Sequence, residues 1–124
     1  MGISDQLPGK PTARQCIGAA GEAQALAHLQ QNGLRLVERN FRCKTGEIDL
    51  IMRDGDTLVF IEVRARADLR HGGAAASITP AKQRRLLRAA HCYLQHWRVL
   101  PACRFDVVAI DGGALCWLRN AIEG

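Results

Sequence analysis

The sequence lacks the features of an exported or membrane-bound protein. Its first 15 residues contain no apolar core of a signal peptide, and no apolar run approaches the length of a membrane span. Its five cysteines form no Cys-x-x-Cys pair, so neither a disulfide framework nor a zinc knuckle is indicated. We therefore expect a soluble, cytoplasmic protein with free thiols and no membrane partner.

Several common catalytic motifs are also missing. No Gly-rich phosphate loop ends in Lys-Ser or Lys-Thr, and neither a Gly-x-Ser-x-Gly elbow nor a Ser-His-Asp arrangement is present. The four histidines lack the spacing of a zinc-binding helix. The charged residues are therefore the main functional signal.

Acidic residues are absent from a long stretch of the second half of the chain. Residues 69–105 contain no Asp or Glu, although seven Lys or Arg lie there. In the whole chain 17 Lys and Arg outnumber 12 Asp and Glu, and the net charge of +5 favours a polyanionic partner such as nucleic acid. A merely soluble basic surface is the plainer alternative.

The length and composition predict one α/β domain. A chain of 124 residues, 48% hydrophobic, suffices for a single core. Pro8, Gly9 and Pro11 predict a flexible segment over residues 1–13, before a folded domain over 14–124. Periodicity and turn signals predict helix 14–31, strands 34–42, 47–53 and 57–66, a helix from Pro80 with its spacing kept to Pro101, and strands 105–110 and 114–118. The predicted order is α-β-β-β-α-β-β, with a candidate mobile loop over 68–77.

Residues 46–64 carry acidic residues inside two apolar strands joined by a tight turn. A two-residue turn at Asp54-Gly55 or Gly55-Asp56 would pair residues whose numbers sum to 109 or 111, and paired residues share a face. One face is then wholly apolar, with Ile48, Leu50, Met52, Val59, Ile61 and Val63. The other is apolar near the turn but carries Glu47, Asp49 and Glu62 at its far end. This pattern predicts a core with one polar pocket.

The negative charge of three carboxylates in one pocket needs to be balanced by positive charge. They repel one another and burial raises their pKa values unless a cation lies close. Arg64 supplies one positive charge, and a divalent ion such as Mg²⁺, which prefers a few hard oxygen ligands, would supply more. A salt-bridge cluster of Glu47 or Glu62 with Arg64 and Arg66 explains the hairpin equally well.

Basic residues recur on one side of the second predicted helix. Lys82, Arg85 and Arg88 stand at spacings that can share a helix face, a geometry suited to gripping phosphates. An ordinary solvated face is the alternative, although such faces usually interleave Glu and this helix has none. Taken with the carboxylates, the pattern favours metal-assisted phosphodiester chemistry.

A series of short motifs along the sequence resembles the motifs of a known family. In order they are Gly18-x-x-Gly21-Glu22, Arg39-Asn40, Gly46-Glu-Ile-Asp-Leu-Ile51, Phe60-Ile-Glu-Val-Arg64, Arg66, Lys82-Gln83-Arg84-Arg85-Leu86 and Arg104-Phe-Asp-Val-Val108. Over about residues 16–110 the sequence resembles the uncharacterised bacterial YraN-like proteins. That family looks like the restriction-endonuclease fold, similar in its core to Holliday junction resolvases. The resemblance implies a central mixed β-sheet flanked by helices.

The PD-(D/E)xK pattern of such nucleases implies a metal site. Carried onto this sequence, it makes Asp49 and Glu62 ligands of Mg²⁺ or Mn²⁺, and Glu22 on the first helix a third carboxylate reaching the site. Glu47 becomes their neighbour. Because the motif normally has Lys two residues after the acid, Arg64 departs from it. Arg binds phosphate but stays protonated, so this departure bears on cleavage more than on binding.

The same resemblance implies contacts with nucleic acid, DNA more than RNA. Lys82 and Gln83, at the positive end of the second helix, are expected to contact phosphates or the site carboxylates. The other expected nucleic-acid contacts are Arg66, Arg70, Arg85 and Arg88. Resolvase-like enzymes often act as dimers, so a homodimer is also an expectation.

Overall fold

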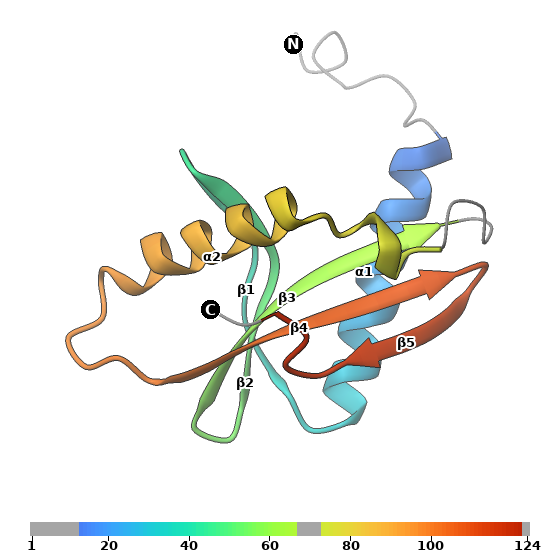
Figure 1. Ribbon diagram of the computed structural model, residues 1–124. Helices are drawn as coiled ribbons and strands as arrows, with labels where there is room; N and C mark the ends of the chain where they lie inside the picture. The colour runs from blue at the N-terminus through green and yellow to red at the C-terminus, as the bar shows by residue number, and fades with distance from the viewer. Residues whose placement is uncertain (1–12, 67–72, 123–124) are drawn as a thin grey trace, which may run out of the picture.

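The computed structural model describes residues 13–66 and 73–122. Its elements are α1 (Ala13–Gln31), β1 (Arg35–Cys43), β2 (Gly46–Asp54), β3 (Thr57–Arg66), the short 3-10 helix η3 (Ala75–Ser77), α2 (Pro80–Leu94), β4 (Ala102–Asp111) and β5 (Ala114–Leu118) (Figure 1). The predicted order is confirmed. Residues 1–12 and 67–72 lie outside the described residues, so the flexible lead-in and most of the mobile loop stay predictions.

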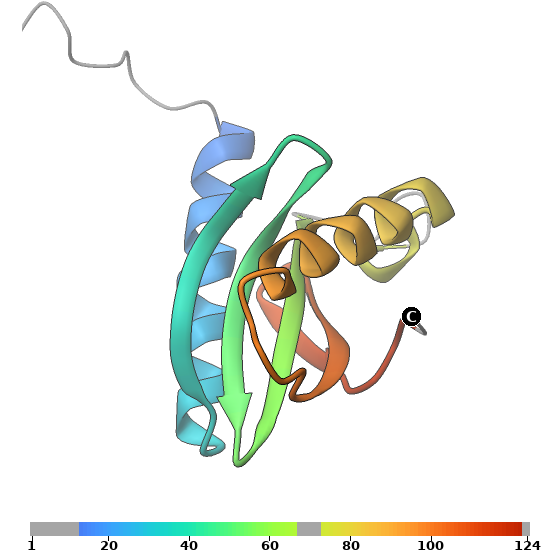
Figure 2. The same cartoon turned by 90° about the vertical axis from the view of Figure 1, so that its left-hand side faces the viewer.

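The five strands form one mixed sheet in the order β1-β2-β3-β4-β5. Strands β3 and β4 pair in parallel, and the other three pairs are antiparallel. Helix α1 lies against one face of the sheet and α2 against the other, which gives three layers (Figure 2). The predicted α/β class, with a central mixed sheet flanked by helices, is confirmed.

Each sheet face has its own apolar core. On the α1 side, Ala25 and Leu29 pack against Leu50, Met52, Val59, Ile61, Val63, Val108 and Ile110. On the α2 side, Leu86, Ala89 and Ala90 pack against Ile48, Ile51, Leu58, Phe60 and Val107. The central strands are therefore covered on both sides, as the apolar runs of β3 and β4 require.

Helix α2 begins where its sequence signals predict and ends earlier. Thr79 is the N-cap, with its Oγ1 accepting from the backbone N–H of Lys82 at 3.3 Å, and Pro80 follows at the first helical position. The prediction that the helix runs on toward Pro101 is wrong, since it ends at Leu94. The N–H of Trp97 donates to the carbonyl of Leu94, three residues back, so the last turn tightens and stops. Trp97 still packs on the α2-side core.

The hairpin turn is Gly55-Asp56, because Asp54 pairs with Thr57. The face predicted for Ile48 is wrong: it lies in the α2-side core, whereas Leu50 lies in the α1-side core. The β2–β3 pairs run from Asp54–Thr57 only to Leu50–Ile61, so strict alternation across this hairpin does not extend to Ile48. Alternation fails there because the two strands part.

Two further expectations concern thiols and membranes. The described cysteines Cys43, Cys92, Cys103 and Cys116 are all free, as predicted. No helix in the described part of the chain is long and apolar enough to cross a membrane.

Candidate functional site

The sheet opens where β2 and β3 diverge. Beyond Leu50, β2 stays paired with β1 through Phe41–Ile48 and Arg42–Glu47, while β3 stays paired with β4. Figure 1 shows the β1–β2 end and the end of β3 pointing in different directions. At the fork, the Oδ2 atom of Asp49 accepts a hydrogen bond of 2.8 Å from the backbone N–H of Val63. The Asp49 carboxylate thus accepts the hydrogen bond that a backbone carbonyl of a paired strand would otherwise accept.

The carboxyl groups of Asp49 on β2 and Glu62 on β3 repel each other when both are charged. Burial raises the pKa of Asp49 to about 6, against the lowering effect of the Val63 N–H, and Glu22 and Glu47 raise it further. Burial and the neighbouring Asp49 raise the pKa of Glu62 to about 8. Both carboxyl groups therefore hold protons more readily than exposed ones, even though Arg64 acts to lower both pKa values.

Glu22 approaches the same region from α1. A Cβ atom on Gly21 would lie 2.9 Å from the Cβ of Ala65, so glycine permits α1 to pack closely on β3. Burial raises the pKa of Glu22, while Arg39 and Arg42 act to lower it. The negative charge of Glu22 also raises the pKa of Asp49, so the two carboxyl groups interact electrostatically, and the role of Glu22 in the site stays a prediction.

Arg64 pairs with Glu62 but with poor geometry. Its Nε lies 3.3 Å from Oε1 of Glu62, and the two side chains are 27% and 15% exposed. The same Nε is buried and has no hydrogen-bond partner among the described residues. The ion pair of the salt-bridge alternative therefore exists, but it leaves a buried donor unsatisfied.

A cleft of about 410 Å³ is lined by Glu62 and Arg64, whereas Asp49 and Glu22 are not among its lining residues. One wall is the β1–β2 turn, with Arg42, Cys43, Lys44, Thr45, Gly46 and Glu47; α2 contributes Lys82, Arg85 and Leu86, and β3 contributes Glu62 and Arg64. Five of the lining side chains are cationic and two are acidic. The cleft thus joins a recessed acidic group to a basic rim.

Lys82 is held inside this cleft. Its Nζ donates to the carbonyl of Ser77 at 3.1 Å. Burial lowers its pKa, and the cations Arg64 and Arg66 lower it further, while Glu62 acts in the opposite direction. A cation in such crowding gains from an incoming anion, so Lys82 is suited to binding phosphate.

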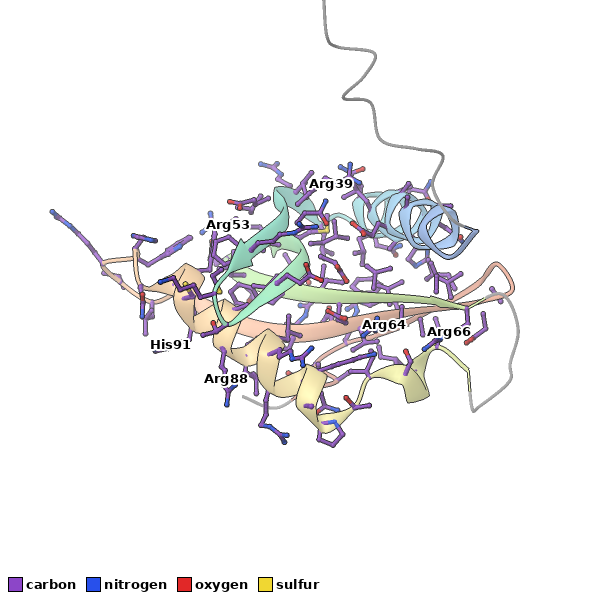
Figure 3. The ribbon with its side chains drawn as sticks, turned by 90° about the horizontal axis from the view of Figure 1, so that it is seen from above. Arg39, Arg53, Arg64, Arg66, Arg88 and His91 are labelled. Atoms are coloured by element: carbon purple, nitrogen blue, oxygen red, sulfur yellow. The ribbon has the colours of Figure 1, made fainter. Side chains whose placement is uncertain are left out.

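The remaining predicted contacts lie apart from the cleft. Gln83 donates its amide to the carbonyl of Ile78 at 3.4 Å and does not line the cleft. Arg88 lines a second cavity, of about 380 Å³, on α2, and it points away from the sheet (Figure 3). Arg66 lies at the exposed end of β3 beside the site, and Arg70 falls outside the described residues.

Sequence reasoning missed the basic residues of the β1–β2 turn. Arg42 and Lys44 form part of the rim, and Arg42 also pairs with Glu47 at 3.4 Å. Two cations spaced around the turn before the acidic strand were the available signal. The strand pairing that brings this turn over α2 is not visible in the local sequence.

The Arg104-Phe-Asp motif has a structural role away from the cleft. Asp106 is fully buried, and its carboxylate accepts from the indole N–H of Trp117 at 2.9 Å and the backbone N–H of Asn120 at 2.8 Å. Arg104 bridges Asp106 and Asp54, with its Nη1 2.8 Å from Oδ2 of Asp54. This network ties the end of the chain to the β2–β3 turn.

The donor chemistry at the fork fits a hard divalent cation. Among the described residues, no three His, Cys, Asp or Glu side chains are gathered closely enough to hold a metal ion. Mg²⁺, however, is commonly held by one or two carboxylates together with water and substrate phosphate. Asp49 and Glu62 are two such oxygen donors, and burial is the main cause of their raised pKa values.

Fold and site together define a class: a small α/β protein in which buried carboxyl groups lie where two strands of a mixed sheet part. Residues 21–110 match the family model described as the uncharacterised protein family UPF0102, and the chain belongs to this family. The resemblance to the YraN-like proteins is thereby confirmed.

The curated relatives are similar over nearly their whole length. A UPF0102 protein of Herminiimonas arsenicoxydans is 66% identical over 112 residues, which cover 90% of each chain. A UPF0102 protein of Cupriavidus metallidurans is 62% identical over 117 residues, covering 94% of this chain and 86% of the relative.

Proposed function

We propose that this protein is a divalent-metal-dependent nuclease that hydrolyses phosphodiester bonds, with DNA as the preferred nucleic acid. The observation that carries the proposal is the pair Asp49 and Glu62, recessed on neighbouring strands with raised pKa values beneath a basic cleft. A bound divalent cation would stabilise the charged forms of both buried carboxyl groups.

Each residue of the site has a role in this proposal. Asp49 and Glu62 hold Mg²⁺ or Mn²⁺, and Glu22 adds negative charge from α1. The bound ion supplies activation of water and stabilisation of charge on phosphorus. Arg64 and Lys82 bind the phosphate and stabilise the charge that develops on it, and Arg85 adds a contact at the rim.

A binding module without turnover is the second candidate. It is favoured by Arg64, which stands where the motif has Lys and is engaged with Glu62 at 3.3 Å. A guanidinium stays protonated and cannot take part in proton transfer. In this alternative the cleft binds the phosphates of nucleic acid, and the protein hydrolyses few phosphodiester bonds. A third candidate, a protein-interaction domain, treats the charge cluster as structural only.

The test compares wild type with Asp49→Ala on labelled duplex, single-stranded and four-way-junction DNA in Mg²⁺, Mn²⁺ or EDTA. The nuclease proposal expects cleavage by wild type alone, abolished by EDTA. Salt-sensitive complexes without cleavage would replace it with the binding module. If the protein neither binds nor cleaves any of these DNAs at low salt, the protein-interaction domain is the remaining candidate. Light scattering of the same sample tests the expected homodimer.

A further inference from the structure

We propose that the cleft admits a single unpaired strand of nucleic acid, gripped through its phosphates, in preference to an intact duplex. This inference rests on the proposed function and specifies its substrate class. It is drawn from the depth of the acidic pair, the contact that closes the cleft and the chemistry of the lining.

The acidic pair lies below the rim. The side chain of Glu62 is 15% exposed, whereas Glu47 and Arg42 on the turn are 63% and 77% exposed. A phosphate must therefore pass between the walls to reach Glu62. In a duplex, base pairing and stacking hold the phosphates at the outer radius of a wide, stiff double helix, so its backbone cannot fold into a narrow cleft. An unpaired strand can bend its backbone inward alone.

The two walls meet at one end of the cleft. A Cβ atom on Gly46 would lie 2.6 Å from the backbone carbonyl oxygen of Arg85, so the turn already packs backbone to backbone on α2. Phe41, which precedes the turn, and Leu87 on α2 pack against the same core. Widening the cleft for a duplex would require separating these packed elements.

The lining favours phosphates over bases. The cations Arg42, Lys44, Arg64, Lys82 and Arg85 all face the cleft, and none of its described lining residues is aromatic. Single-strand sites that bind bases stack them on aromatic rings, whereas a basic groove follows the backbone without reading sequence. We therefore expect binding that depends on strandedness and salt but little on base sequence.

A path for the strand continues along α2. Thr45 lines both the cleft and the second cavity, where Arg88 and His91 lie. Figure 3 shows Arg64 between the sheet and α2, and Arg88 on the outer side of α2. A nucleic-acid strand that leaves the cleft past Thr45 would reach Arg88, and this exposed cation would then bind one of its phosphates.

The experiment measures binding by fluorescence anisotropy, with full-length wild type in EDTA so that no probe is cut. The probes are one labelled oligonucleotide alone, the same strand in a blunt duplex, and that duplex with an unpaired tail. Lys44→Ala removes a rim cation, and Arg35→Ala is its matched control, since Arg35 is an exposed cation at the other end of β1.

We expect the single strand and the tailed duplex to bind about ten-fold more tightly than the blunt duplex. Lys44→Ala should weaken that binding, and Arg35→Ala should not. Equal or tighter binding of the blunt duplex would overturn the single-strand inference while leaving the nuclease proposal standing. Failure to bind any probe at low salt, together with no cleavage in Mg²⁺ or Mn²⁺, would overturn the proposed function itself.

Discussion

The Asp49 carboxylate accepts the hydrogen bond of the Val63 backbone N–H, at 2.8 Å, where β2 and β3 part. A buried N–H left unpaired at such a fork would cost free energy, so this acceptor permits the strands to separate. Asp49 also raises the pKa of Glu62, which lines the cleft. One side chain therefore links the opening of the sheet to the proposed chemistry.

Substitution of Asp49 should separate its two roles. At pH 5, below its pKa of about 6, we expect Asp49→Ala to lower the free energy of unfolding by about 1–3 kcal/mol, because the Val63 N–H loses its acceptor. Asp49→Asn keeps a carbonyl oxygen and should lose less. Urea denaturation measures both, and equal stability of the two variants would contradict the role given to this bond.

Glu62 should make the protein less stable as pH rises. Its folded pKa of about 8 exceeds the ordinary 4.5, so the folded state binds the proton more tightly and loses that advantage as pH rises toward 8. We expect Glu62→Gln to raise the free energy of unfolding at pH 8 by on the order of 2 kcal/mol, and by much less at pH 5.

Glu47→Gln is the matched control for that comparison, because Glu47 is exposed on the neighbouring strand. It should change stability little at either pH. If Glu62→Gln were instead less stable at pH 8, the ion pair with Arg64 would outweigh the repulsion, and the salt-bridge explanation of the cluster would be preferred.

Metal binding should be coupled to proton release. Because Asp49 and Glu62 must lose their protons to ligate, Mn²⁺ should raise Tm more at pH 8 than at pH 6. Calorimetry or thermal-shift measurements at the two pH values, with and without MnCl₂, provide the test. The increment should vanish in Asp49→Asn and persist in Glu47→Gln; a pH-independent increment in all variants would place the ion elsewhere.

Arg64→Lys should increase cleavage. Lys restores the side chain of the motif, and its ammonium can shed a proton where a guanidinium cannot, so we expect a gain of about ten-fold or more in Mn²⁺-dependent hydrolysis. Arg35→Lys, at the other end of β1, is the control and should leave the rate unchanged. A loss of activity in Arg64→Lys would show that the bidentate guanidinium itself is required.

Local sequence patterns predicted most of the fold. The element order, the Thr79 cap and the turn at residues 54–56 follow from periodicity and turn chemistry, which act over a few neighbouring residues. The end of α2 was not predicted, because Trp97 keeps helical spacing and packs on the core without being helical. Packing in the core fixes the position of the Trp97 side chain, and a non-helical backbone can also bring the side chain to that position.

The site was predicted in its residue types and only partly in its arrangement. Glu22, Asp49, Glu62, Arg64 and Lys82 are brought to one region, whereas Gln83 contacts the carbonyl of Ile78 and Arg88 lines another cavity. A helix of basic residues does not reveal which of them face a partner element. That choice depends on how α2 rotates to bury Leu86, Ala89 and Ala90.

Composition and short-range pattern were enough to establish a basic α/β domain with acids on two adjacent strands, because charge and periodicity are properties of neighbouring residues. The fork at Asp49, the seating of the β1–β2 turn on α2 and the recessed position of Glu62 arise from contacts between segments far apart in the chain. Their positions follow from burying two cores on one sheet while pairing the backbone N–H of Val63 where β2 leaves β3.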